Sequence, residues 1–312
     1  KLNPGLIGIE HSSGIDSNSI MGILRYEIGI KSDQIQSWSD FGTGEMKYIS
    51  EFRKFYDLKI DNCHQISKKN DKKSYISNLE KIINIFGFPL QVGGALHKYE
   101  KLSLEKCTTI FSGLGGDQCL SNNGGNAITN LVEQRRISEL YQWTNRNSLM
   151  TIRMIISRFL AKNSDLWYRK KIFNDPTRFK DNGILEKFLT SEGKIKLKHH
   201  IRKEYPWEVD YFIDQKTSIK NRISSNWLGV RVEDETLIAK QFNLKTIYPL
   251  LNEFIISSCL NQDVTFFANS WKDGRLILRE GLSDLLPEFL RDNPSKERDF
   301  DSRDYKLSIK RN

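Results

Sequence analysis

A short turn rich in serine and glycine directly follows the first apolar run of the chain. Residues Ser12 to Ser19 read SSGIDSNS, between the apolar run LIGI at 6–9 and apolar positions that recur at helical spacing from Ile20 onward. The order therefore predicts a strand, a tight turn and a helix. A turn of this kind at a helix N-terminus is suited to binding phosphate, because the first N–H groups of the helix are available to an anion.

Individual residues of this turn support the phosphate-binding interpretation. Gly14 lets the backbone bend and approach a ligand closely, while Ser12 and Ser17 provide hydroxyl groups. Asp16 does not suit an anion site unless Mg²⁺ lies between its carboxylate and the phosphate oxygens. The turn lacks the Gly-Lys-Ser/Thr ending of a Walker loop. Because Ser, Gly, Asp and Asn are also common turn formers, an ordinary turn remains the alternative.

Size and cysteine usage restrict the class of protein. A chain of 312 residues can bury a large core. Its four cysteines, the first at Cys63 and the last at Cys259, lie far apart without CxxC spacing, which favours the reducing cytoplasm. The sequence has no apolar run of about eighteen residues and no signal-peptide layout, so we expect no membrane segment. Because a core strand follows closely on Lys1, we expect that an N-terminal portion was removed or belongs to another polypeptide.

The charge balance favours acidic partners without indicating a nucleic-acid surface. Lys and Arg number 48 against 39 Asp and Glu, a net charge of +9. Basic clusters such as KKNDKK at 68–73 are scattered and lack interleaved aromatic residues. We therefore expect a solvated surface and no nucleic-acid partner.

Short apolar runs alternate with amphipathic stretches up to about residue 113, as in βαβ units of a parallel sheet. We expect strands at Leu6–Glu10, Gln34–Ser39, Asn62–Ile66 and Thr108–Ser112, and helices near Asp16–Ile28, Glu45–Tyr56 and Lys73–Phe86. The first turn then lies at the carboxyl edge of the sheet, where open α/β sheets bind ligands. The charged, mostly helical stretch from about 130 to 240 predicts a helical lobe.

A second glycine-dense turn carries one carboxylate. Residues 108–125 read TTIFSGLGGDQCLSNNGG, a strand pattern followed by Gly113, Gly115, Gly116 and Asp117. The glycines remove side chains where a backbone would pass close to a bound nucleotide. If the two strands are neighbours, Asp16 and Asp117 face one crevice and together suit octahedral Mg²⁺.

The two turns in this order resemble the synthetase domain of the asparagine synthetase superfamily, which includes β-lactam synthetases and lasso-peptide macrolactam cyclases. The similarity extends to the C-terminus through an R-x-E motif, a YPLLN stretch, an LR pair and an LLPE ending with a later lysine. These are Arg231-Val-Glu233, Tyr248 to Asn252, Gly274-Arg275 with Leu278-Arg279-Glu280, Leu285 to Glu288, and Ser295-Lys296.

The resemblance implies a fold and a domain organisation. The fold would be α/β, with a doubly wound, mostly parallel sheet of the PP-loop (adenine nucleotide alpha hydrolase-like) class and a helical lobe. Residues 1–130 and 240–312 would form the ATP-pyrophosphatase core, and residues 131–239 the lobe within the same domain. The glutaminase-like N-terminal domain of the family would be absent from this chain.

The resemblance also implies an activity, namely ATP-dependent, AMP-forming amide ligation with Mg²⁺. Ser12, Ser13, Gly14 and Ser17, with the glycines of the second turn, would bind ATP and pyrophosphate, and Asp16 and Asp117 would hold the metal. Lys296, Arg231 and Glu233 would be catalytic. The substrate would be a carboxylate, with a precursor peptide of the lasso type as one candidate.

Two departures from the family pattern keep alternatives open. Ser13 stands where the family has glycine, and Leu114 stands where relatives carry Glu, Tyr or His. Because Leu cannot act as an acid or base, Leu114 argues against the asparagine synthetase reaction itself. The alternatives are an asparagine synthetase-type amidotransferase, a tRNA-modifying PP-loop enzyme and an inactive relative that serves as an interaction module.

Overall fold

Two compact units make up the chain. A computed structural model describes residues 5–39, 46–59, 63–65, 72–88, 90, 96–120, 125–163, 190, 192, 213–268 and 275–292. The first unit comprises Lys1–Leu120, Gly229–Cys259 and Arg275–Asn312, and the second comprises Ser121–Leu228 and Leu260–Gly274. Within the described ranges, no helix combines the length and the apolar character needed to cross a membrane.

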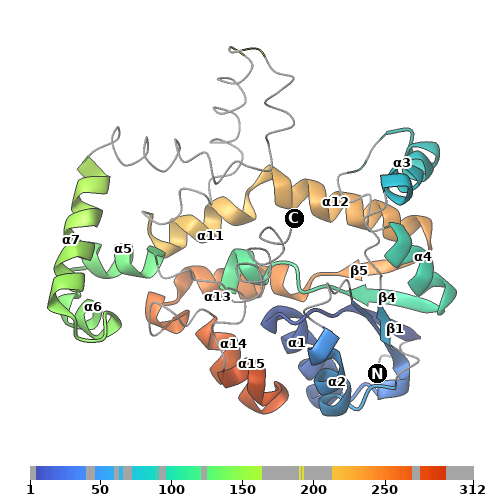
Figure 1. Ribbon diagram of the computed structural model, residues 1–312, viewed down its shortest axis with the longest axis horizontal. Coiled ribbons are helices and arrows are strands. Elements are labelled where there is room, and N and C mark those ends of the chain that lie inside the picture. Colours follow the sequence, from blue (N-terminus) through green and yellow to red (C-terminus); the bar gives the residue numbers. More distant parts are fainter. Residues whose placement is uncertain are drawn as a thin grey trace, which may run out of the picture. The chain divides into compact units, whose positions relative to one another are not determined.

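A parallel sheet forms the centre of the first unit (Figure 1). Its five strands run in the order β3-β2-β1-β4-β5 and every neighbouring pair is parallel. The strands are β1 (Leu6–Glu10), β2 (Ile35–Ser39), β3 (Cys63–Gln65), β4 (Cys107–Phe111) and β5 (Lys245–Ile247). The predicted α/β class with a parallel sheet is therefore confirmed, as are the first four strands. Strand β5 was not predicted from the sequence.

The helices of the first unit follow the strands in the expected alternation. They are α1 (Ile15–Gly22), which continues as the π-helical turn η1 (Ile23–Glu27), α2 (Met46–Phe55), α3 (Lys72–Phe86), α4 (Leu96–Leu104), α14 (Leu276–Gly281) and α15 (Glu288–Asp292), with most of α12 (Asn226–Gln241) and α13 (Glu253–Asn261). The three predicted helices are confirmed, whereas α4 was not predicted.

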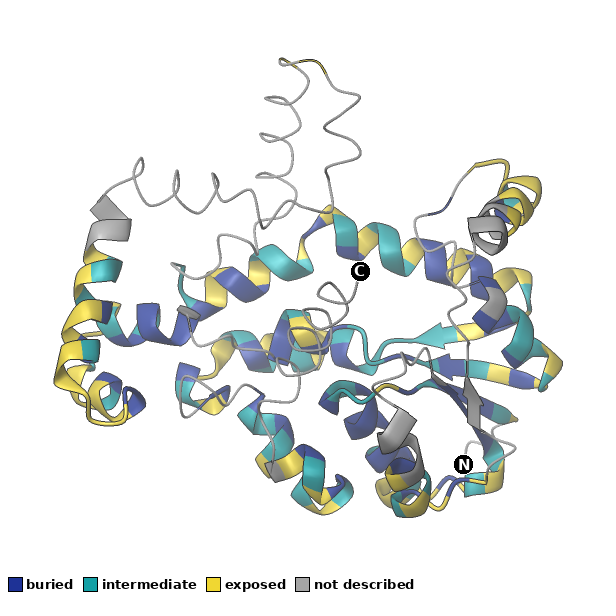
Figure 2. Cartoon of the chain, viewed as in Figure 1, coloured by how far each residue is buried: buried dark blue, intermediate teal, exposed yellow. Residues whose placement is uncertain are grey.

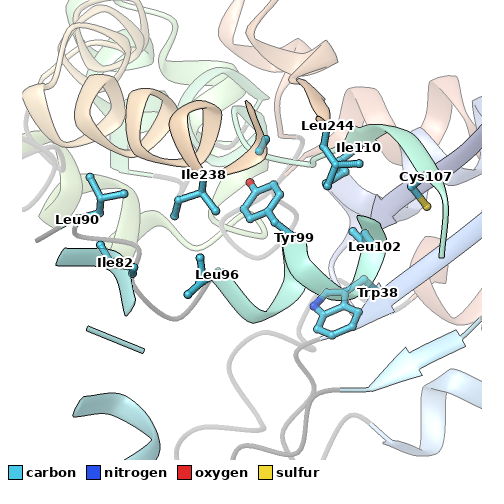
Figure 3. Packing of buried hydrophobic residues seen from close by; sticks show 11 residues of the cluster. Trp38, Ile82, Leu90, Leu96, Tyr99, Leu102, Cys107, Ile110, Ile238 and Leu244 are labelled. Carbon is cyan, nitrogen blue, oxygen red and sulfur yellow. The ribbon is translucent and has the colours of Figure 1, made fainter. Parts of the chain in front are cut away.

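Helices cover both faces of the sheet, so β1 is buried along its centre (Figure 2). On one face, α3, α4 and α12 supply a core that includes Ile82, Tyr99, Leu102 and Ile238 (Figure 3). A Cβ at Gly8 of β1 would lie 3.2 Å from Leu102, so this glycine allows α4 to pack closely on the sheet.

The opposite face packs against α1 and α2. The ring of Phe52 on α2 lies 4.7 Å from His11 and 5.1 Å from Phe289 on α15. Gly22 of α1 directly faces the backbone carbonyl of Leu285, the first residue of the LLPE stretch. The LLPE stretch therefore contributes to the core of the first unit.

The second unit is helical throughout its described elements. These are α5 (Gly125–Glu133), α6 (Ile137–Trp143), α7 (Ser148–Asn163), α11 (Gln215–Ile223) and the 3₁₀ turn η9 (Val264–Phe266). Leu131, Leu140 and Val264 belong to its apolar core. The backbone N–H of Gln215 donates to Asn130 Oδ1 at 2.7 Å, which ties α11 to α5. The helical character predicted for this stretch is confirmed in the described part.

We expect Gly22→Ala to lower the free energy of unfolding by about 1–3 kcal/mol, because the added methyl group would overlap the Leu285 carbonyl. Urea denaturation would measure the change. Gly229→Ala is the matched control, since a Cβ at Gly229 meets no atom within 4 Å. Equal stability of the two variants would contradict the packing of α1 on the LLPE stretch.

Candidate functional site

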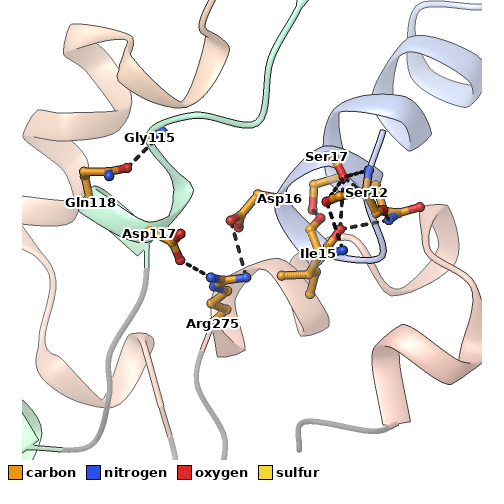
Figure 4. Close-up of polar contacts among 11 residues, drawn as sticks. Ser12, Ile15, Asp16, Ser17, Gly115, Asp117, Gln118 and Arg275 are labelled. Atoms are coloured by element: carbon orange, nitrogen blue, oxygen red, sulfur yellow. Dashed lines mark hydrogen bonds and ion pairs between the residues drawn. The ribbon is translucent and has the colours of Figure 1, made fainter. Parts of the chain in front are cut away.

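The turn after β1 is held together by its own side chains (Figure 4). Ser12 N donates to Ser17 Oγ at 3.0 Å, and Gly14 N donates to Ser12 Oγ at 3.1 Å. Gly14 has a φ of −76°, which any residue can adopt, so it does not supply the sharp bend that we expected. A Cβ there would lie 3.2 Å from Ser12 Oγ, so glycine leaves room for the hydroxyl that closes the turn. Ser13 lies half-buried in the same turn.

Two buried polar residues, His11 and Asn18, stabilise this turn through hydrogen bonds. Asn18 Nδ2 donates to the carbonyl oxygens of Ser12 and Gly14 at 2.9 Å and 2.8 Å, and Asn18 Oδ1 lies 2.9 Å from His11 Nε2. Because Asn18 presents its carbonyl oxygen to the ring, His11 donates from Nε2. His11 Nδ1 then accepts from the Ser37 hydroxyl at 3.1 Å. Neither residue was selected from the sequence, although His11 directly precedes the turn and Asn18 lies within it.

We expect the stability of the fold to fall as the pH decreases from 6.5 towards 4. Burial lowers the pKa of His11 from 6.5 to about 4, so the unfolded chain binds more protons than the native one in this window. The free energy of unfolding should decrease by about 3 kcal/mol in total, and the decrease should be complete below the pKa that His11 has in the folded state. Chemical denaturation at several pH values would measure it. His11→Gln should lack this component of the pH dependence, and an identical profile for both proteins would contradict the assignment.

The second turn lies directly against the first. It follows β4, which is the neighbour of β1, and includes the π-helical turn η5 (Gly116–Leu120). A Cβ at Gly113 would lie 2.9 Å from Ser17 N, and a Cβ at Gly116 would overlap the Asp16 carboxyl group. The structure therefore brings together the two turns that the sequence singled out, and these glycines allow the contact.

Gly115 has a different role from its neighbours. Its φ of +106° lies in a region that favours glycine, and a Cβ would lie 2.8 Å from the Leu251 side chain. Leu114, beside it, donates its backbone N–H to Ser112 Oγ at 3.3 Å. The 3₁₀ turn η8 (Pro249–Leu251) of the YPLLN stretch thus packs on the second turn.

Arg275 bridges the two aspartates (Figure 4). Its guanidinium lies 3.3 Å from Asp16 Oδ2 and also forms an ion pair with Asp117. The side chains of Arg275 and Asp16 are 9% and 14% exposed, whereas that of Asp117 is 71% exposed. Two carboxylates, from the turns that follow β1 and β4, therefore converge on one positive charge. From the sequence, Arg275 belongs to the Gly274-Arg275 pair of the C-terminal similarity, and no function was predicted for it.

The R-x-E motif lies on α12, at the edge of the first unit that carries the carboxyl end of β5. Arg231 Nε donates to Glu235 Oε1 at 3.1 Å, and the Tyr248 hydroxyl donates to Glu235 Oε2 at 3.0 Å. Glu235 is buried, whereas Glu233, the residue selected from the sequence, is exposed. Lys296 lies outside the described residues.

No protein-family model matches the chain, and a search of curated proteins found no significant match. The resemblance to the asparagine synthetase superfamily therefore rests on the sequence motifs alone.

Proposed function

We propose that the chain is an ATP-dependent, AMP-forming amide ligase of the PP-loop class, similar to the asparagine synthetase superfamily. The observation that carries this proposal is the convergence of Asp16 and Asp117 on one cationic group. Each aspartate lies in a glycine-containing turn that follows one of two adjacent parallel strands. Ligands of open α/β sheets bind at such carboxyl ends.

The donor set fits Mg²⁺. Mg²⁺ in nucleotide sites takes one or two carboxylates and completes its octahedron with phosphate oxygens and water. Asp16 and Asp117 already face a common positive charge, that of Arg275, so they would hold the ion. The ion would neutralise negative charge on the phosphates as the bond between the α- and β-phosphates breaks.

The proposed chemistry has two steps. A substrate carboxylate oxygen attacks the α-phosphorus of ATP, and pyrophosphate departs towards the turn of Ser12, Ser13, Gly14 and Ser17. An amine nitrogen then attacks the acyl carbon, AMP leaves with the electron pair of the broken C–O bond, and the amine loses a proton. Lys296 would stabilise the departing phosphate, as its match to the family lysine suggests.

The substrate class follows from the apolar position in the second turn. Leu114 offers only its backbone N–H, which bonds to Ser112, so this position provides no polar side chain for ammonia or aspartate. This favours a larger carboxylate, such as that of a precursor peptide, over the asparagine synthetase reaction.

We expect Asp16→Ala and Asp117→Ala each to abolish ATP-dependent pyrophosphate formation, since each removes one of two ligands for the cation. Pyrophosphate release with precursor peptides and with small carboxylates as substrates would measure this. Asp33→Ala, at an exposed aspartate of the same unit, is the control and should retain activity. Normal turnover of either site variant would refute the shared cation.

Gly116→Ala tests the geometry without removing a functional group. The methyl group would displace the Asp16 carboxylate, so we expect a loss of pyrophosphate formation comparable to that of Asp16→Ala. Gly229→Ala, whose Cβ meets no neighbour, should behave as the parent protein. Full activity of Gly116→Ala would mean that Asp16 acts from another position.

A further inference from the structure

The guanidinium of Arg275 binds the same two carboxylates that we assign to the metal ion (Figure 4). Its Nη1 lies 3.3 Å from Asp16 Oδ2, and its Nη2 forms the ion pair with Asp117 Oδ1. Mg²⁺ coordinates carboxylate oxygens at about 2.0–2.1 Å and therefore needs direct access to them. The guanidinium and a divalent ion thus compete for Asp16 and Asp117.

Asp16 is held in place by the packing of the two turns. It lies in the first turn of α1, and its carboxyl group is so close to Gly116 that a Cβ there would overlap it. The Asp16 side chain is 14% exposed, so the second turn and its surroundings leave it little room to move. An ion that binds Asp16 must therefore displace Arg275 from this carboxylate.

The backbone of Arg275 favours this displacement. Arg275 directly precedes α14 and has a φ of 62°, in the left-handed region. For a residue with a side chain this conformation costs about 1–2 kcal/mol, which the two ion pairs offset. When an ion takes over the carboxylates, the backbone loses this compensation and relaxation becomes favourable. Strained residues of this kind are common at positions that switch between two arrangements.

The charge balance determines what has to accompany the ion. Asp16 and Asp117 carry two negative charges against the single positive charge of Arg275. A divalent ion alone would reverse this balance, and it would also take both carboxylates from a guanidinium whose side chain is only 9% exposed. Separating a poorly solvated charge from its partners is costly. A polyphosphate provides negative charge for the ion and for the guanidinium, which removes this cost.

We propose that Arg275 is an internal counter-ion of the metal site, which a divalent cation displaces only together with a polyphosphate. Arg275 then makes the binding of the two ligands cooperative, because each of them lowers the cost of binding the other. Free metal ions are rejected, and the site selects a polyphosphate that arrives with its ion. Arg275 is a positioning residue in this scheme. The identification of the polyphosphate as ATP or pyrophosphate rests on the proposed function.

The displacement can be observed in the unmodified protein by NMR of its ¹⁵N-labelled arginine side chains. The signal of Arg275 is assigned by its absence from the variant Arg275→Lys. We expect millimolar Mg²⁺ alone to leave this signal unchanged, because the guanidinium keeps both carboxylates. Mg²⁺ with pyrophosphate should shift it. A signal that Mg²⁺ alone shifts fully, or that does not respond to Mg²⁺ with pyrophosphate, would overturn the proposal.

Variants test the competition through the affinity for Mn²⁺ alone, measured from the electron paramagnetic resonance signal of the free ion. Arg275→Gln removes the competing charge and should bind Mn²⁺ at least about tenfold more tightly than the parent protein. Arg275→Lys keeps the charge and should bind as weakly as the parent.

Two further variants locate the effect. Arg275→Gln/Asp16→Asn should lose the gain in Mn²⁺ affinity, because the ion then lacks one of its two carboxylates. Arg153→Gln, at an exposed arginine of α7 in the second unit, is the matched control and should bind Mn²⁺ as the parent does. An unchanged affinity of Arg275→Gln would overturn the counter-ion role.

The ligase and the counter-ion fail in different experiments. Tighter Mn²⁺ binding by Arg275→Gln, from a protein that forms no pyrophosphate with any carboxylate, would remove the ligase and leave the counter-ion intact. Pyrophosphate formation that depends on Asp16, from a protein whose Mn²⁺ affinity does not respond to Arg275→Gln, would remove the counter-ion alone.

Discussion

The close approach of two turns determines the arrangement of the candidate site. A β-carbon at Gly113 would lie closer to Ser17 than a normal van der Waals contact allows. A β-carbon at Gly116 would overlap the carboxyl group of Asp16. Because the turns end adjacent parallel strands, their polar groups meet at one edge of the sheet. Two like charges brought together in this way repel each other, and Arg275 compensates for both.

The local sequence pattern predicted most strands and helices of the first unit, because apolar runs and glycine-rich turns depend only on residues that are neighbours in the sequence. Contacts between distant segments were harder to predict. Arg275 lies 158 residues after Asp117, and no periodicity connects them. The R-x-E motif drew attention to Glu233, yet helix geometry places Arg231 beside Glu235, because residues four apart share a helix face and residues two apart do not. His11 and Asn18 were missed because their role depends on burial.

Two ion pairs, Glu10 with Lys98 and Arg231 with Glu235, change the interpretation of the apolar residue in the second turn. From the sequence, Leu114 suggested that a polar side chain for substrate recognition is lacking near the two turns. In the fold, β1, α4 and α12 bring Glu10, Lys98, Arg231 and Glu235 to the same edge. Ion pairs contributed by separate segments leave no short motif, so only the structure shows that these charged groups lie near the ends of the strands.

The backbone at Arg275 supports a functional position for its side chain. Seven non-glycine residues in the described ranges have positive φ, and six of them follow the end of a helix, where left-handed backbone is a common termination. Arg275, with φ of 62°, instead precedes α14. This conformation costs about 1–2 kcal/mol. The ion pairs with Asp16 and Asp117 offset that cost. The two carboxylates of the adjacent turns therefore also fix the backbone conformation at the start of α14.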